Sequence, residues 1–372
     1  MTSSNTSTTL PRQRTALIVQ GPGKLTVQHD VPVPALAADQ VLVKTAAVAI
    51  NPVDAKMLDF SPASGAIPGH DFAGTVVALG DDTKASGRFA VGDRVAGYLY
   101  GNNKGKPEVG AFAEYTTAYA DVLLKIPDNM SFAEAAGLGL GVATAATGLF
   151  RELKVPGSVD VKDSTQDADA KNDREFVLVA GGSTATGTRA LQLCKLAGLR
   201  PIATCSPANF NLALRFGAEK VFDYHSPTCA ADIKAYTKNE LAYALDCVTE
   251  SDTTQLCYAA MGRAGGRYVA LEPFREQIAK TRALTVEPSW LMALDIFGDE
   301  VHLEGEYHRE ANPKNRENAA KLFAGVQALM DRGLIEAHPV KAERGGWQGV
   351  VQGVDTVRKQ PLSGQKLVYS VA

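Results

Sequence analysis

The first third of the chain consists of short apolar runs separated by turn-forming residues, a pattern that predicts β-strands. Glycine, proline and aspartate interrupt the runs, for example at 21–23 and 91–93. Short strands at this spacing are typical of a barrel-like β domain. The expected strands are 15–19, 24–27, 41–50, 75–79, 94–98, 112–116 and 122–126.

Helical signals begin at Ser131 and Glu134, which have the spacing of a capping box and predict helices over 132–136 and 144–153. From residue 176, continuous apolar runs alternate with helical segments, which indicates a doubly wound parallel sheet. The expected strands are 176–180, 201–205, 220–223, 242–247 and 267–271, and the helices between them are 184–197, 209–216, 230–237 and 253–261. The C-terminal part adds helices 317–332 and 348–358 and a strand 366–371.

The order of these patterns predicts an α/β protein with two domains. Residues 13–140 and 310–372 are expected to form the β domain, and residues 141–309 a nucleotide-binding domain inserted between them. Residues 1–12, rich in serine and threonine, are expected to be a disordered tail, and the polar residues 157–174 a solvated loop. A chain of 372 residues is long enough for two such domains.

Charge and cysteine content exclude some binding partners and favour one cellular compartment. A formal net charge of −3 provides no chain-wide basic field for nucleic acid or an anionic membrane. The uncharged stretch 135–150 is too short and too rich in small residues to span a bilayer. The five cysteines are odd in number and contain no C-x-x-C pair, which favours a reduced compartment over a disulfide framework. We therefore expect a cytoplasmic protein.

The most informative segment is a turn of small residues that follows the expected strand 176–180 and opens the next helix. Small residues let the backbone approach a pyrophosphate, and the N–H groups and dipole of the helix N-terminus then hold the anion. This context is what a dinucleotide-binding fingerprint requires. The alternative is a tight strand–helix turn of some other α/β protein. The candidate residues are Gly181, Gly182, Ser183, Thr184, Ala185 and Thr186.

The residues after the second strand of this domain bear on the choice of cofactor. Sites that prefer NAD place Asp or Glu there to accept from the ribose 2′-hydroxyl. This chain has Ser206 and Pro207 instead, and the absence of a carboxylate admits the 2′-phosphate of NADPH. Ser206, Asn209 and Tyr224 are candidate phosphate partners. Asn209 alternatively caps the following helix, and the two roles are compatible.

The segment 69–74 resembles the Gly-His-Glu motif of zinc alcohol dehydrogenases. A catalytic zinc normally needs three protein ligands, but the chain has no cysteine before Cys194 and no four-cysteine structural zinc loop. We therefore expect no metal and interpret His70 as a hydrogen-bonded turn residue. Without zinc as a Lewis acid, reduction of a conjugated C=C bond is favoured over alcohol oxidation, because the negative charge delocalises into an enolate.

Segments 49–56, 69–74, 91–95 and 181–187 together resemble zinc-free medium-chain dehydrogenases/reductases, quinone reductases included. A narrower set is similar to the trans-acting enoyl reductases of fungal polyketide pathways, of the lovastatin type. It comprises 181–186, 202–207, 221–224, 236–239, 243–247, 262–266 and 362–366, and the resemblance extends over nearly the whole chain. It implies a GroES-like β domain, a Rossmann domain and an active site in the cleft between them.

The resemblance also implies NADPH and a thioester substrate on an acyl carrier domain of a partner polyketide synthase, or of a synthase–peptide synthetase hybrid. Lys56 matches the family position at the cleft and is the candidate proton donor or enolate stabiliser. Its alternative role is a surface contact to the cofactor phosphate or ribose. By motif match, further cofactor contacts are implied at Val53, Asp54, Ala55, Lys56, Ser206, Pro207, Ala208, Asn209, Tyr224, Leu271, Ser363 and Gly364.

Two segments are implied to line the substrate channel, where small residues leave room for an acyl chain. Small residues in the first of them equally suit close packing against the sheet. The implied residues are Thr144, Ala145, Ala146, Thr147, Gly148, Leu149, Asp295, Ile296, Phe297, Gly298 and Asp299.

The strand that begins at Gly266 bears on the oligomeric state, because in dimeric relatives the corresponding edge strand pairs across the dimer. Pro273 lacks an N–H donor and Glu272 and Arg275 add charge, so we predict a monomer. Two other functions compete with enoyl reduction in trans: a stand-alone quinone or enone reductase, and a non-catalytic NADPH-binding protein. The narrower motif set favours the first function.

Overall fold

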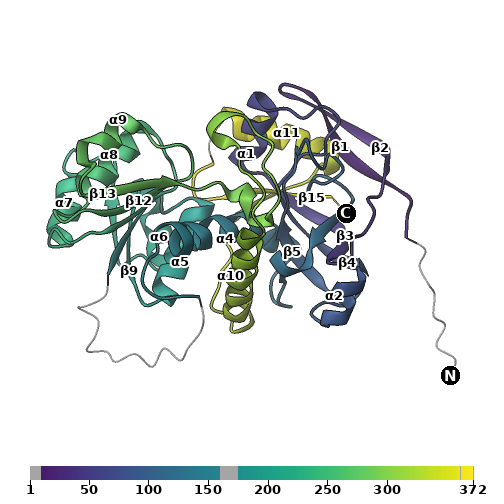
Figure 1. The fold of residues 1–372 in the computed structure, drawn as a ribbon, viewed down its shortest axis with the longest axis horizontal. Coiled ribbons are helices and arrows are strands. Elements are labelled where there is room, and N and C mark those ends of the chain that lie inside the picture. The colour runs from purple at the N-terminus through teal and green to yellow at the C-terminus, as the bar shows by residue number, and fades with distance from the viewer. Residues whose placement is uncertain (1–9, 160–174, 361, 372) are drawn as a thin grey trace. The chain divides into compact units, whose positions relative to one another are not determined.

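The computed structural model describes residues 10–159, 175–360 and 362–371 (Figure 1). The predicted disordered tail and polar loop therefore lie largely outside the described residues. The chain divides into two compact units. Unit 1 comprises Met1–Ala136, Ala342–Gln360 and Leu367–Ala372, and unit 2 comprises Gly137–Lys341 and Pro361–Lys366. Among the described residues, no helix has both the length and the apolar character needed to cross a membrane.

Unit 1 is the β domain that the strand pattern predicts. Its main sheet has seven strands in the order β14-β15-β3-β4-β5-β7, with β6 also paired to β3, and β1 and β2 form a separate antiparallel pair. Seven of the ten residues of the central strand β3 are buried. The strands are β1 (Gln13–Gly21), β2 (Lys24–Pro32), β3 (Gln40–Ala49), β4 (Asp71–Leu79), β5 (Arg94–Tyr98), β6 (Tyr115–Tyr119), β7 (Leu123–Lys125), β14 (Val340–Glu343) and β15 (Lys366–Ser370).

Short helices connect these strands. The capping box that predicts a helix after residue 131 is confirmed, because Glu134 accepts from the Ser131 N–H at 2.8 Å and the Ser131 hydroxyl accepts from the Glu134 N–H at 3.3 Å. Two further helices occur where the sequence pattern predicts neither a helix nor a strand, one directly after β3 and one after β4. The helices are α1 (Pro52–Phe60), α2 (Asp81–Ser86), η1 (Ala120–Val122), α3 (Phe132–Ala136) and α11 (Gly346–Lys359).

Unit 2 contains a six-stranded parallel sheet in the order β10-β9-β8-β11-β12-β13, the strand order of a Rossmann fold. Helices cover both faces of the sheet (Figure 1). Because the strands are buried on both faces, they are continuous apolar runs in the sequence. The strands are β8 (Phe176–Ala180), β9 (Arg200–Cys205), β10 (Lys220–Asp223), β11 (Tyr243–Asp246), β12 (Gly266–Ala270) and β13 (Val286–Trp290).

The helical segments of unit 2 include one departure from the expected helix 144–153. This segment begins earlier as an α-helix and continues as a π-helix over its last six residues. The segments are α4 (Gly139–Ala146), η2 (Thr147–Glu152), α5 (Ala185–Leu196), η4 (Pro207–Asn209), α6 (Phe210–Arg215), α7 (Cys229–Tyr236), α8 (Ser251–Ala260), α9 (Glu276–Ala279), η5 (Lys280–Arg282), η6 (Ala293–Phe297), η7 (Gly305–Tyr307) and α10 (Pro313–Asp331).

The edge of the parallel sheet differs from the one assumed in the sequence analysis. β12, the strand that begins at Gly266, pairs with β11 on one side and with β13 on the other, so it is an inner strand. The strand ends at Ala270, before Pro273, and the edge strand is β13. Pro273 therefore follows an inner strand, and the prediction that it blocks pairing at an edge strand is wrong. β13 itself contains Pro288, which also lacks an N–H donor.

The boundary between the two units also differs from the predicted return to the β domain at residue 310. α10 packs against α4 and η6, and it therefore belongs to unit 2, which continues to Lys341. A short return, Pro361–Lys366, also belongs to unit 2. This return brings Ser363 and Gly364 to the nucleotide-binding domain.

Candidate functional site

The turn after β8 requires glycine because backbone segments approach one another closely. Gly181 has a φ of +77°, a conformation that favours glycine. A Cβ atom on Gly187 would lie 2.3 Å from the carbonyl oxygen of Gly181, so only glycine lets the first turn of α5 pack on the turn. The small residues that predict close approach to a ligand thus also let helix α5 pack against the end of strand β8.

The backbone N–H groups of this turn have separate tasks. Those of Gly181 and Gly182 donate to the Thr204 carbonyl of β9 at 3.1 and 2.9 Å. The Thr184 hydroxyl caps α5 by accepting from the Gly187 N–H at 2.9 Å. The N–H groups of Ala185 and Thr186 open the helix and have no carbonyl one turn earlier to accept from them. These two groups, with the helix dipole, fit a phosphate.

A second group of candidate residues meets beside α6. The Asn209 side-chain amide donates to the Ser206 hydroxyl at 3.1 Å and to the Ser363 hydroxyl at 2.8 Å. Gly364 has a φ of +64°, and a Cβ atom there would lie 2.7 Å from the Asn209 side-chain oxygen. Asn209 occupies the N-cap position of α6 but makes no capping hydrogen bond with its side chain. The structure therefore brings Ser206, Asn209 and Ser363 together, although Asn209 and Ser363 are 154 residues apart in the sequence.

Tyr224 follows β10 directly, and its position is fixed by the register Asp223↔Cys205 between β10 and β9. Because the two strands are parallel, Tyr224 and Ser206 leave the sheet at the same edge. The Tyr224 ring is half-exposed and contacts the His225 ring, with 4.0 Å between the ring centroids and 32° between the ring planes. His225 holds the Asp223 carboxylate through its backbone N–H at 3.0 Å and Nδ1 at 2.9 Å, and these bonds lower the pKa of Asp223.

His225 was missed in the sequence analysis. The available signal was its place one residue after Tyr224, at the same carboxyl edge of the sheet as the expected phosphate partners. Leu271 also follows the end of a strand, β12, and its N–H donates to the Thr249 hydroxyl at 3.0 Å. Pro207 and Ala208, in the short helix η4, are exposed.

In unit 1, the segment that carries Lys56 is helix α1, with Asn51 at its N-cap and Pro52 at its first position. The Asp54 carboxylate accepts from the Asn51 N–H at 2.6 Å and from Nδ1 of His70 at 2.6 Å. Near the other end of the helix, Asp59 makes a bidentate pair with Arg358 of α11 at 2.8 and 2.9 Å. Both ends of α1 are thus attached to neighbouring elements.

The four candidate residues of α1 differ in exposure. Asp54 and Ala55 are buried, Val53 is partly buried and Lys56 is exposed. The Asp54 side chain is engaged inside the protein by the helix cap and by His70, so of these four residues only Val53 and Lys56 reach the surface.

His70 is buried and hydrogen-bonded, in agreement with its interpretation as a hydrogen-bonded residue. Its other nitrogen, Nε2, has no hydrogen-bond partner among the described residues. The adjacent Asp71 accepts from the Asn51 side-chain amide at 2.9 Å. Within residues 10–159, 175–360 and 362–371, no three His, Cys, Asp or Glu side chains are arranged to hold a metal ion. The expectation of a zinc-free enzyme stays a prediction.

We expect Asp54→Ala to lower the free energy of unfolding by about 3 kcal/mol, because it removes a helix cap and leaves the buried His70 Nδ1 without an acceptor. Chemical denaturation at neutral pH measures the change. Asp82→Ala, at an exposed carboxylate in the first turn of α2, is the matched control and should change it by less than about 0.5 kcal/mol. Equal effects of the two substitutions would contradict a structural role for the Asp54–His70 pair.

The two segments expected to line the substrate channel are tied together in unit 2. Arg151 of η2 makes a bidentate salt bridge with Asp295 of η6 at 2.9 and 3.0 Å. Burial alone lowers the pKa of Arg151, but Asp295 and Glu152 more than offset this effect and raise it. Asp295 is therefore engaged in holding the two segments together.

The other channel candidates show how tightly this region packs. A Cβ atom on Gly148 would lie 3.1 Å from a methyl group of Leu245 in β11, so glycine serves close packing here. Gly298 and Asp299, at the end of η6, are partly exposed. The buried candidates are Thr144, Ala145, Ala146, Thr147, Leu149, Asp295, Ile296 and Phe297.

Comparison with known families agrees with this two-part architecture. The family described as Alcohol dehydrogenase GroES-like domain matches residues 37–128, and the family described as Zinc-binding dehydrogenase matches residues 185–298. Among solved structures, the chain is similar to the CurK enoyl reductase with a TM-score of 0.72 and 20% identity, over 96% of this chain and 99% of that one. At that identity the likeness shows the fold.

These features define a medium-chain dehydrogenase/reductase: an oxidoreductase with a GroES-like domain and a Rossmann-like domain. The chain is 63% identical to the trans-enoyl reductase caaB of Aspergillus niger over 97% of this chain and 98% of that protein. It is 60% identical to the trans-enoyl reductase thnE of Trichoderma harzianum over the full length of both. The protein belongs to the trans-enoyl reductase family, as the sequence motifs predicted.

Proposed function

We propose that this enzyme uses NADPH to reduce the α,β-unsaturated acyl thioester carried by an acyl carrier domain of a partner polyketide synthase or synthase–peptide synthetase hybrid. Identities of 63% over 97% of the chain and of 60% over its full length to two trans-enoyl reductases carry the proposal. The geometry of the Gly181–Thr186 turn supports a nicotinamide cofactor, since the open N–H groups of Ala185 and Thr186 fit a pyrophosphate.

NADPH rather than NADH is supported by the residues at the carboxyl ends of β9 and β10. The position after β9 that holds an acid in NAD-preferring sites is Ser206. Ser206, Asn209 and Ser363 form one cluster of hydrogen-bonding groups. The carboxylate of the neighbouring Asp223 is already hydrogen-bonded to His225. We infer that the cluster, Tyr224 and His225 bind the 2′-phosphate.

When bound, the cofactor supplies a hydride for the β-carbon of the unsaturated thioester. The protein must then deliver a proton to the α-carbon or stabilise the enolate oxygen. Lys56 carries a cationic N–H group and is exposed on a helix that is anchored near both ends. We assign it this role. The segments around η2 and η6 are assigned to contact the acyl chain.

The names of the relatives support a partner synthase, because an enzyme that acts in trans reduces a substrate bound to another protein. We propose a monomer, since Pro288 in the edge strand β13 lacks an N–H donor for pairing across a dimer. A cytoplasmic location is supported by the five cysteines, all of which are free thiols.

The proposal is tested by following NADPH oxidation with an α,β-unsaturated acyl-pantetheine thioester and, separately, with free quinones. We expect turnover of the thioester and little turnover of quinones. NADH in place of NADPH is the control for cofactor preference. Brisk reduction of quinones without turnover of the thioester would overturn the proposal in favour of a stand-alone quinone reductase.

A further inference from the structure

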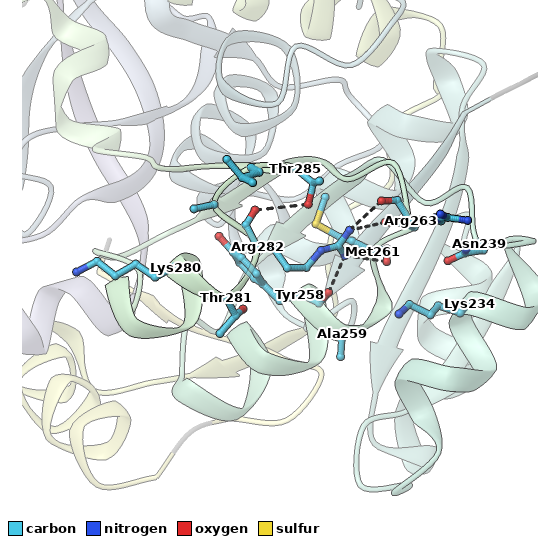
Figure 2. Close-up of a pocket in the computed structure, with 13 residues that line it drawn as sticks. Lys234, Asn239, Tyr258, Ala259, Met261, Arg263, Lys280, Thr281, Arg282 and Thr285 are labelled. Atoms are coloured by element: carbon cyan, nitrogen blue, oxygen red, sulfur yellow. Dashed lines mark hydrogen bonds between the residues drawn. The ribbon is translucent and has the colours of Figure 1, made fainter.

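A basic pocket of about 740 Å³ lies on unit 2, in a region that the proposed chemistry does not use (Figure 2). It is formed by helix α7, the C-terminal end of α8 and the segment that leads through η5 into β13. We refer to it as the basic pocket. Its lining residues are Lys234, Asn239, Tyr258, Ala259, Met261, Gly262, Arg263, Lys280, Thr281, Arg282, Ala283, Leu284 and Thr285.

The charges of the basic pocket all have one sign. Lys234, Arg263, Lys280 and Arg282 line it, and the lining contains no aspartate or glutamate. Lys280 also pairs with Glu276 at 3.2 Å, but both side chains are about three-quarters exposed, so this pair holds little energy. The residues that line the pocket therefore carry positive charge only, although the whole chain has a net charge of −3.

Arg282 gives the basic pocket a fixed charge. Its guanidinium donates to the carbonyl oxygens of Tyr258, Met261 and Gly262 at distances from 2.6 to 3.1 Å, at the C-terminal end of α8. A cation is stabilised there by the helix dipole. Figure 2 shows Arg282 between Lys280 on one side and Lys234 with Asn239 on the other. The positive surface thus has a rigid centre.

An exposed apolar side chain accompanies these cations. Leu284 lines the basic pocket and is 100% exposed, the largest exposed fraction recorded among the large hydrophobic residues. Single exposed leucines are common on protein surfaces. In a pocket lined by four basic side chains, however, Leu284 adds an apolar contact to an electrostatic one. The complementary surface is an acidic segment of a protein that presents an apolar side chain of its own.

The basic pocket and the phosphate-binding turn lie at opposite ends of the strands of the same parallel sheet. Gly262 and Arg263 precede β12, and Thr285 precedes β13, so the pocket lies at the amino ends of these strands. Gly181 follows β8, at the carboxyl end. All six strands are parallel. A protein bound at the basic pocket therefore leaves the cofactor-binding edge open.

We propose that the basic pocket is an anchoring site for an acidic surface of the partner synthase. This inference rests on the proposed function. Anchoring suits an enzyme that acts on a tethered substrate, because binding of the synthase at one site raises the effective concentration of its carrier domain at the active site. Exposed cations also accelerate the encounter with an acidic surface, and salt screens this effect.

Charge reversal in the basic pocket tests the proposal. The double variant Arg263→Glu and Lys280→Glu should raise KM for the synthase-bound substrate roughly tenfold or more at low salt, since the two charges repel an acidic surface. Turnover of a free enoyl-pantetheine thioester should be unchanged, because neither residue belongs to the cofactor or substrate groups. Raising the salt to 0.5 M should reduce the difference between wild type and variant.

A matched control is the double variant Lys314→Glu and Lys321→Glu on α10, which changes the net charge by the same amount at exposed residues outside the pocket lining. It should behave like the wild type. Unchanged kinetics with the synthase in the pocket variant would overturn the anchoring proposal. An equal loss with the free thioester would overturn it too, since the pocket would then act on folding or catalysis. Absence of thioester turnover in the wild type would instead refute the proposed function.

Discussion

Lys56→Ala lowers kcat for reduction of an enoyl-pantetheine thioester about 100-fold if Lys56 delivers the proton or stabilises the enolate, since general acid catalysis contributes about 10² to 10⁴. The helix should survive the change, because Lys56 is exposed and alanine has the highest helix propensity. Steady-state kinetics with both substrates varied measures the effect, and thermal unfolding verifies that the variant is folded.

The two roles considered for Lys56 have different kinetic signatures. A residue that only contacts the cofactor phosphate or ribose changes KM for NADPH and leaves kcat intact. Lys56→Arg separates them further, because arginine keeps the charge but does not give up a proton near neutral pH. Rescue by arginine would assign Lys56 to cofactor binding and exclude proton donation. Lys44→Ala, at an exposed lysine of β3, is the control and should be silent.

Ser206→Asp should weaken NADPH binding about 100-fold, because two like charges about 4 Å apart repel by a few kcal/mol at a partly exposed site. The affinity for NADH should stay the same or improve, since a carboxylate at this position accepts from the ribose 2′-hydroxyl. Titration of cofactor fluorescence with NADPH and NADH measures both affinities. The expected outcome is a reversal of cofactor preference.

Ser206→Asn controls for the size of the new side chain without its charge. It should leave the preference for NADPH in place. If the aspartate variant binds NADPH as tightly as the wild type does, the cluster of Ser206, Asn209 and Ser363 does not face the 2′-phosphate. The assignment of NADPH would then require a different explanation.

The parallel sheet and its phosphate turn could be predicted from sequence because both are local patterns. Each inner strand is an apolar run between helices, and the small residues 181–187 lie directly between β8 and α5. β13 was missed because Pro288 interrupts an otherwise strand-like run, and proline in a strand is confined to edges and bulges. The structure places β13 at the edge of the sheet, so β13 rather than β12 is the strand available for pairing across a dimer.

Helix α1 was missed although its start signals are present. Asn51, Pro52 and Asp54 occupy the N-cap, first and third positions. The nine residues of this helix are too few for a clear helical period. The contacts that organise the site could not be predicted at all. Asp54 with His70, Arg151 with Asp295, and Asn209 with Ser363 join distant residues, which only the fold brings together.

The hydrogen bonds from Gly181 and Gly182 to Thr204 have a consequence for how the cofactor associates. They close the turn against β9 with bonds made entirely within the protein, so the shape of the anion cradle does not depend on a ligand. Little backbone ordering remains for the moment of binding, and preorganisation of this kind increases affinity without adding a contact. We therefore expect the backbone of this turn to change little in conformation when the cofactor binds.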